Sequence, residues 1–235
     1  MIKQYKELTI IVIVALIGAV SYYFLSFDAP SLADYPVQGI DVSHYQKDIK
    51  WQELDKQQVQ FAFIKATEGG DFKDEKFLTN WTEAKKQNIP VGAYHFFTFC
   101  KSGAEQAKNF IETVPADSTS LPPVIDLEYA GNCDLTKTIP ELLTEIEIFA
   151  QQLENYFHKK PILYVTSDFY EEAIMGKFTE NPIWLRSIRS EPSLPDGRKW
   201  SFWQYENRGD LQGIKIYTDL NVFNGSRKEF EALLQ

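Results

Sequence analysis

Residues 122–133 have the sequence PPVIDLEYAGNC, in which a short apolar strand ends in two acidic residues. Asp126 and Glu128 are one residue apart, so on a strand both side chains point to the same face. Burying a lone carboxylate is costly, so each acid needs a partner, a proton or a chemical task. Two solvated loop acids are the alternative interpretation, and the rest of the sequence decides between them.

Short apolar runs and amphipathic segments alternate on both sides of this stretch. The apolar runs predict strands at residues 39–42, 61–66, 91–97, 124–127, 162–165, 183–185, 201–204 and 218–222. The amphipathic segments predict helices at residues 51–57, 75–88, 104–113, 139–158 and 168–175, and from residue 226 onward.

This order of elements predicts one α/β domain over residues 36–235. The first five strands each precede a helix, whereas the last three follow one another with only loops between them. Strands separated by helices pair in parallel, and about eight of them predict a closed or nearly closed barrel. A doubly wound open sheet is the alternative. In a barrel, the chemistry lies at the carboxyl ends of the strands.

Four acidic residues fall on or beside the predicted strands, among apolar neighbours. They are Asp41, Asp126, Glu128 and Asp219. Like charges held close together cannot all ionise, so one group keeps a proton while another stays charged. Glycoside hydrolysis needs that combination: one acid protonates the leaving oxygen, and one carboxylate stabilises positive charge at the sugar carbon. A metal-dependent hydrolase is a rival interpretation, because four acids offer oxygen ligands to a hard cation.

The sequence resembles the family 25 glycoside hydrolases, which are lysozymes that cleave peptidoglycan between N-acetylmuramic acid and N-acetylglucosamine. The matching stretches, in the family's order, are GIDVSHYQ from Gly39, FAFIKATEG from Phe61, VGAYHFF from Val91, EQAKNF from Glu105, PPVIDLE from Pro122, ILYV from Ile162, IWL from Ile183, FWQY from Phe202 and TDLNVFNG from Thr218. The resemblance implies a flattened (β/α)5(β)3 TIM-like barrel, an N-acetylmuramidase activity, and no metal or other cofactor.

The resemblance also implies roles for the four acids. The family's catalytic positions fall on Asp41, Asp126, Glu128 and Asp219, and Glu128 corresponds to the general acid. Asp126 corresponds to its partner, which either orients the 2-acetamido group of the substrate or stabilises the oxocarbenium charge directly. Both routes are known for glycosidases, and the spacing of the two acids is compatible with either.

Four aromatic residues match family positions that line the glycan groove, namely Tyr94, Tyr164, Trp184 and Trp203. Apolar sugar faces stack on such rings, although each ring could also belong to the core. The chain departs from the family after Trp184, where Arg186 stands in the sequence LRS instead of a small residue with an aromatic nearby.

Other polar residues in the matching motifs are expected to support the site. Lys65 and Glu68 suggest an ion pair that fixes a loop, and His44 and His95 are expected to form hydrogen bonds behind the reacting groups.

Cys100 and Cys133 are the only cysteines. No CxxC motif or histidine cluster favours a metal site. The pair is not general to the family, and it falls just after the third and fourth predicted strands, in neighbouring loops on the catalytic face. We therefore expect a disulfide between them.

The N-terminal region predicts a membrane anchor. Residues 8–27 form a run of 20 residues without a charge, and a helix of that length spans the roughly 30 Å hydrocarbon core. Lys3 and Lys6 precede it, so residues 1–7 are expected in the cytoplasm and the domain outside, after a linker at residues 28–35. A signal peptide cleaved near Ala33 is the alternative, and it would give a secreted protein.

The charge and composition limit the partners. The net charge is −9 and no basic run occurs, which argues against a nucleic-acid partner. We expect a monomer that acts on peptidoglycan glycan strands and contacts the membrane through its N-terminal helix. A glycan-binding envelope protein without catalysis is the alternative from another functional class.

Overall fold

The computed structural model describes residues 12–15, 18, 29–188 and 190–235. Most of the membrane-spanning helix predicted at residues 8–27 therefore lies outside the described residues. Among the residues that are described, no helix is both long and apolar enough to cross a membrane.

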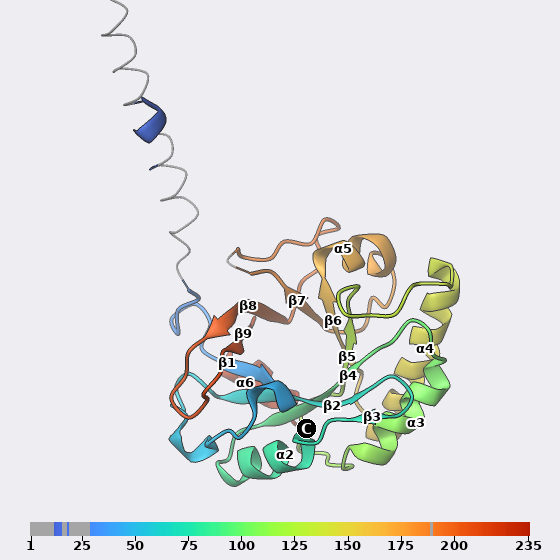
Figure 1. The fold of residues 1–235 in the computed structure, drawn as a ribbon, viewed down its shortest axis with the longest axis horizontal. Helices are drawn as coiled ribbons and strands as arrows, with labels where there is room; N and C mark the ends of the chain where they lie inside the picture. Colours follow the sequence, from blue (N-terminus) through green and yellow to red (C-terminus); the bar gives the residue numbers. More distant parts are fainter. Residues whose placement is uncertain (1–11, 16–17, 19–28, 189) are drawn as a thin grey trace, which may run out of the picture.

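Eight strands close into a barrel, as the sequence predicts (Figure 1). They are β1 (Gln38–Val42), β2 (Phe61–Glu68), β4 (Val91–Phe96), β5 (Val124–Leu127), β6 (Ile162–Thr166), β7 (Ile183–Arg186), β8 (Phe202–Gly209) and β9 (Thr218–Phe223). Pairing of β1 with β2 closes the ring, which continues through β4, β5, β6, β7, β8 and β9 back to β1. A short strand that the sequence analysis missed, β3 (Phe72–Lys73), pairs antiparallel with the end of β2.

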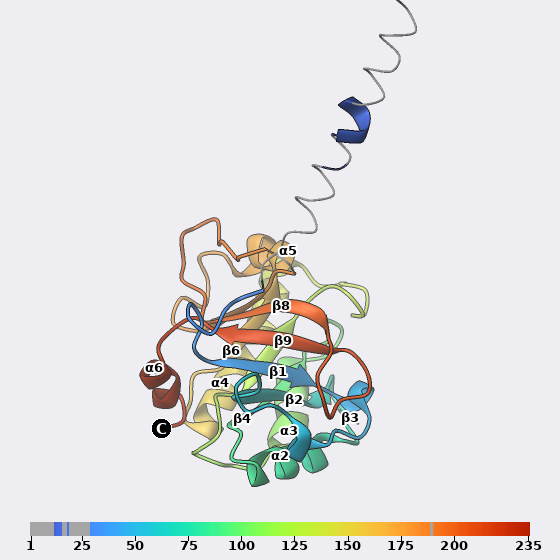
Figure 2. The same cartoon turned by 90° about the vertical axis from the view of Figure 1, so that its left-hand side faces the viewer.

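The direction of the last strand places part of the candidate site. The seven strands β1, β2, β4, β5, β6, β7 and β8 follow one another around the ring, and each is parallel to the next. Strand β9 runs antiparallel to both of its neighbours, β8 and β1. Figure 2 shows β8, β9, β1 and β2 side by side. Because β9 runs the other way, its beginning, with Asp219, meets the carboxyl end of β1, where Asp41 lies opposite it.

The strands separate two apolar layers. Alternate residues of β2 illustrate this, because Phe61 and Phe63 pack inside the barrel while Ala62 and Ile64 face the surrounding helices. Inside the barrel, the rings of Phe63 and Trp184 stack with their centroids 4.6 Å apart.

Glycine makes room for these rings. A Cβ atom at Gly92 would lie 2.6 Å from the ring of Phe63, so this position favours a residue without a side chain.

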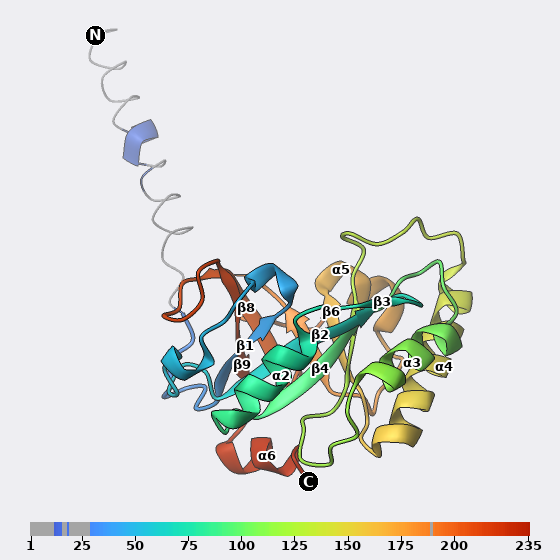
Figure 3. The same ribbon diagram turned by 60° about the horizontal axis from the view of Figure 1, so that its bottom comes forward.

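The helices lie outside the barrel or across its amino end. They are α2 (Phe77–Lys86), α3 (Gly103–Thr113), α4 (Ile139–Phe157), α5 (Ser167–Phe169), the following π-helical turn η3 (Tyr170–Ile174), and α6 (Arg227–Ala232). Phe230 of α6 packs on Phe61 at the start of β2 and on Phe223 at the end of β9. Helix α6 therefore covers the amino end of the barrel, and Figure 3 shows it on the underside.

The helix predicted at residues 51–57 is wrong. Only one 3₁₀ turn forms there, η2 (Trp51–Glu53), and it follows a second short turn, η1 (His44–Gln46). Asp55 ends the segment, because its side chain accepts a hydrogen bond from the backbone of Gln57 and its carbonyl accepts from Val59. Such local hydrogen bonds compete with those of a helix.

Candidate active site

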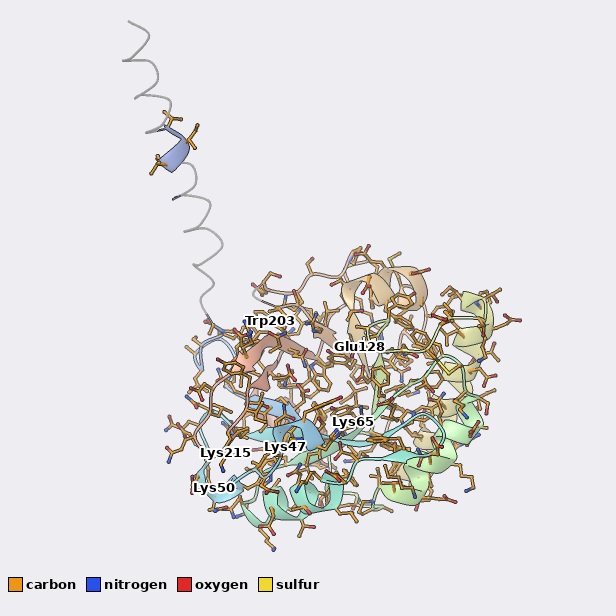
Figure 4. All side chains as sticks on the ribbon, viewed as in Figure 1. Lys47, Lys50, Lys65, Glu128, Trp203 and Lys215 are labelled. Carbon is orange, nitrogen blue, oxygen red and sulfur yellow. A yellow bond between two sulfur atoms is a disulfide. The ribbon has the colours of Figure 1, made fainter. Side chains whose placement is uncertain are left out.

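An open cavity of about 770 Å³ lies at the carboxyl end of the barrel. All four predicted acids line it: Asp41 from β1, Asp126 from β5, Glu128 one residue beyond β5, and Asp219 from β9. Figure 4 labels Glu128 near the centre of the molecule. The strand ends therefore bring together four carboxyl groups that lie up to 178 positions apart in the chain.

Asp41 is held by a network of side-chain hydrogen bonds. Its Oδ2 accepts from Nε2 of Gln204 at 2.9 Å and from Nδ2 of Asn221 at 2.7 Å. The amide oxygens of these residues accept in turn, that of Gln204 from the Tyr164 hydroxyl at 3.0 Å and that of Asn221 from the Trp184 indole at 2.9 Å. Each amide is thereby oriented with its NH₂ group toward the carboxylate, which favours the ionised form of Asp41.

Asp41 and Asp219 face each other across β1 and β9, and their pKa values differ. Burial raises the pKa of Asp41 to about 6, and the amide donors, a hydrogen bond with Asp219 and the charge of Arg186 limit the rise. Burial and the neighbouring charge of Asp41 raise the pKa of Asp219 to about 8. Near neutral pH, Asp41 is therefore the carboxylate and Asp219 keeps its proton.

Asp126 and Glu128 lie on the same side of the chain and differ in burial. Burial and the charge of Glu128 raise the pKa of Asp126 well above its usual range. Asp126 is 7% exposed, and its buried Oδ1 forms no hydrogen bond with any group that the structure describes. Burial also raises the pKa of Glu128, while the charge of Arg186 opposes the rise. Glu128 is only partly buried, so its carboxyl group reaches the open part of the cavity.

Three of the four aromatic residues that were predicted to line the glycan groove line the cavity. They are Tyr94 on β4, Tyr164 on β6 and Trp184 on β7. Trp203 does not line it. It is 2% exposed, packs against Tyr35 and Trp200, and donates its indole N–H to the Ser187 carbonyl at 2.7 Å. Figure 4 shows Trp203 apart from Glu128.

The alternation along β8 explains the placement of Trp203. Phe202 packs inside the barrel, so Gln204, two residues later, points into the cavity, while Trp203 points to the outer layer. The alternation set by Phe202 was the signal that could have identified Gln204 from the sequence.

The sequence analysis also missed other lining residues. Arg186 ends β7, Tyr129 lies in the loop after β5, and Asp168 lies in α5, which follows β6. The Tyr129 hydroxyl donates to Glu172 at 2.7 Å. Only Arg186 carried a signal in the sequence, as a departure from the family pattern.

The expected ion pair and histidine hydrogen bonds are present. Nζ of Lys65 lies 2.8 Å from Glu68, and Nδ1 of His44 lies 2.8 Å from Asp74. His95 is fully buried and its pKa is lowered to about 3 by burial, so it is neutral. Its ring nitrogens bond Thr67 at 2.7 Å and Gln106 at 3.1 Å, which hold β4 beside β2 and α3.

A disulfide joins Cys100 and Cys133, as expected, with their Cα atoms 6.1 Å apart. Between these loops, the Asn132 side chain accepts from the backbone of Phe99 at 2.9 Å and donates to the carbonyls of Phe97 at 2.9 Å and Glu128 at 3.0 Å. The disulfide and Asn132 therefore fix the loop that follows Glu128 to the end of β4.

The rival interpretation of a metal-dependent hydrolase needs a group of metal ligands in the described part of the chain. No group of three or more His, Cys, Asp or Glu side chains in it is arranged to hold a metal ion.

Comparison with known proteins shows which proteins this chain is similar to. A family model described as Glycosyl hydrolases family 25 matches residues 40–214. Lysozyme M1 from Streptomyces globisporus is 34% identical over 208 residues, which are 84% of this chain and 71% of that protein. The Escherichia coli K12 protein YegX is 36% identical over 207 residues, which are 86% of this chain and 75% of that protein. The solved structure of a family 25 glycosyl hydrolase from Bacillus anthracis has a TM-score of 0.81 and 46% identity, covering 86% of this chain and 95% of that one.

Proposed function

The chain belongs to glycosyl hydrolase family 25, and from this we propose that it hydrolyses the β-1,4 bond between N-acetylmuramic acid and N-acetylglucosamine in peptidoglycan. It is a glycoside hydrolase by its family. The names of relatives support the substrate, since they include a lysozyme and N,O-diacetylmuramidases.

The observation that carries the proposal is the convergence of five carboxyl groups and four aromatic rings on one open cavity. A glycan needs both kinds of group, because rings cover the apolar faces of sugars and carboxyl groups perform acid and charge chemistry at the glycosidic bond.

We assign the role of proton donor to Glu128. Its raised pKa keeps the carboxyl group protonated to a higher pH than that of a solvated glutamate. Its partial exposure at the cavity supports this role, because a leaving-group oxygen could approach the carboxyl group from there.

Asp126 is proposed as the partner of Glu128. Its buried Oδ1 lacks a hydrogen-bond donor among the described residues, and the N–H of a 2-acetamido group would supply one. That contact would orient the acetamido carbonyl toward the sugar carbon. Direct stabilisation of the oxocarbenium ion by the ionised form of Asp126 is the second route. Asp41, held as a carboxylate by its amide donors, adds negative charge to the same cavity in either case.

We propose that the domain of residues 36–235 acts outside the cytoplasm. The disulfide supports this location, because such bonds persist in oxidising compartments. Peptidoglycan lies there as well. The uncharged run at residues 8–27 is proposed to attach the domain to the membrane, with cleavage of a signal peptide as the alternative.

Product analysis tests the bond specificity. The purified protein is incubated with peptidoglycan, the new sugar ends are reduced with borohydride, and the sugar alcohols are identified after acid hydrolysis. We expect muramitol. Release of glucosaminitol would assign cleavage to the other glycosidic bond, and the absence of both products would overturn the proposal.

A further inference from the structure

Arg186 brings a positive charge into the acidic cavity. It ends β7, two residues after Trp184, so both side chains lie on the cavity face of the strand, and both line the cavity. Its register partners are Thr166 on β6 and Gln204 on β8, so it lies in the wall of the cavity and not at a distant rim.

The guanidinium group of Arg186 acts on the nearby carboxyl groups of Asp41, Glu128 and Asp219 through its charge. It forms no hydrogen bond and no ion pair with any other residue in the described part of the chain, although it is partly buried. Other cations are used: Arg198 donates to the carbonyls of Lys177 and Phe178, and Lys65 pairs with Glu68. The five donors of Arg186 are therefore available to a ligand.

The charges around Arg186 permit an anionic ligand. Of the acids in the cavity wall, Asp219 keeps its proton near neutral pH because its pKa is about 8. Asp126 is also biased toward its protonated form by burial. The cavity therefore carries less negative charge than its acidic residues alone would suggest.

We propose that Arg186 binds a carboxylate carried by the muramic acid unit of the glycan, and so selects substrate. The inference rests on the proposed function. The carboxylate is either the lactyl group of a muramic acid without a peptide, or a carboxylate of an attached stem peptide. A guanidinium group suits either one, because its planar fork matches the two oxygens of a carboxylate.

A different role for Arg186 makes a different prediction. If it only adjusts the charge of Asp41 and Glu128, its loss lowers the rate on every substrate by the same factor. If it also binds a carboxylate, its loss lowers the rate by a larger factor on substrates that carry one than on neutral substrates. The ratio of rates on two matched substrates therefore separates the two roles.

The experiment measures kcat/KM on short glycans of alternating N-acetylglucosamine and N-acetylmuramic acid. In one preparation the lactyl carboxylates are free, in a second they are converted to methylamides, and in a third they carry a stem peptide with its own free carboxylates. Wild type is compared with Arg186→Gln, with Arg186→Lys, which keeps the charge without the fork, and with Arg208→Gln. Arg208 lies over the Tyr217 ring and outside the cavity lining, so its variant controls for the loss of one positive charge.

We expect wild type and Arg208→Gln to prefer a carboxylate substrate over the methylamide by about 10-fold or more. Arg186→Gln should lose that preference, and Arg186→Lys should keep only part of it. Preference for the free lactyl group or for the peptide-bearing glycan identifies which carboxylate is bound. An equal preference in wild type and Arg186→Gln would overturn the inference and leave the proposed function intact. Failure of wild type to cleave any of the three substrates would instead remove the proposed function.

Discussion

Asp41 and Asp219 face each other across the pairing of β1 and β9, and their surroundings separate their charges. Asp41 receives two amide donors, from Gln204 and Asn221, which stabilise its negative charge. Asp219 lies beside that charge and is partly buried, so its pKa rises further. Near neutral pH this facing pair therefore carries one negative charge, on Asp41, and one proton, on Asp219.

Replacement of Asp219 by Asn should stabilise the protein in a pH-dependent manner. The pKa of Asp219 rises from 3.8 to about 8 on folding. The folded chain therefore holds this proton more tightly than the unfolded chain, and the resulting stability is present below pH 3.8 and lost as the pH rises toward 8. An Asn amide cannot ionise and can still donate to Asp41. Urea unfolding should show a gain on the order of 2 kcal/mol for Asp219→Asn at pH 8 and little at pH 4.

The exposed Asp210 offers a matched control, because Asp210→Asn changes the same charge at the surface. Its effect should be small at both pH values. An equal gain in the free energy of unfolding from Asp219→Asn at both pH values would contradict the assignment of a proton to Asp219.

Four of the acidic residues of the site were predictable from the sequence, but the contacts that their supporting groups make were not. Asp126 and Glu128 interrupt an apolar strand, and that conflict is visible in the sequence. Gln204 and Asn221 are ordinary polar residues until the barrel brings them to Asp41. Trp203 was misplaced because its aromatic side chain suggested a sugar contact, whereas the alternation of β8 turns it to the outer layer.

At the scale of elements, the loops after β4 and β5 form one connected unit. The disulfide joins them, Asn132 bonds both loops, and Lys137 donates to the Phe99 carbonyl at 2.7 Å. Phe99 also packs against Tyr129, the residue after Glu128. The position of the proposed proton donor therefore depends on contacts with the neighbouring loop.

Removal of the disulfide should destabilise the protein and reduce its activity. The bond closes a loop with a sequence separation of 33 residues, for which the loss of chain entropy in the unfolded state predicts about 3 to 4 kcal/mol. Cys100→Ser with Cys133→Ser should lower the free energy of unfolding in urea by about that amount. The loosened loop should also lower kcat on peptidoglycan.

Reducing agent provides the internal control for this prediction. It should destabilise wild type and leave the double variant unchanged. Two free thiols in the native protein by mass spectrometry would contradict the bridge.

The helices were predictable where a helix cap and an amphipathic face coincide. Helix α4 has a capping box of Thr138 and Glu141, and its predicted range is within one residue of the observed one. The direction of β9 was not predictable, because the local pattern of a strand is the same whichever way its neighbours run. Only closure of the barrel determines that Asp219 meets Asp41.

At the scale of the whole molecule, the barrel has one covered end and one open end. Helix α6 packs Phe230 against the amino end, and the cavity opens at the carboxyl end. Active sites of such barrels lie at the carboxyl end because the loops there are free to vary while the other end maintains the fold.

The N-terminal anchor that we propose predicts where the enzyme is found in a cell. In a bacterial host, the full chain should sediment with membranes and require detergent for release, because residues 8–27 form a long uncharged run. A chain with a cleavable secretion signal in place of residues 1–33 should be soluble outside the cytoplasm. If expression of the full chain instead yields a soluble protein whose sequence begins near Asp34, the result favours a cleaved signal peptide.

The central claim is that Glu128 donates the proton to the leaving oxygen. It is tested by comparing Glu128→Gln with wild type on peptidoglycan and on an aryl glycoside of N-acetylmuramic acid, whose leaving group needs little protonation. Glu147→Gln, at an exposed position of α4, serves as the control. We predict that Glu128→Gln loses about 10² to 10⁴-fold in kcat on peptidoglycan and much less on the aryl glycoside. Cleavage of peptidoglycan by Glu128→Gln at a rate within a few-fold of wild type would contradict the account.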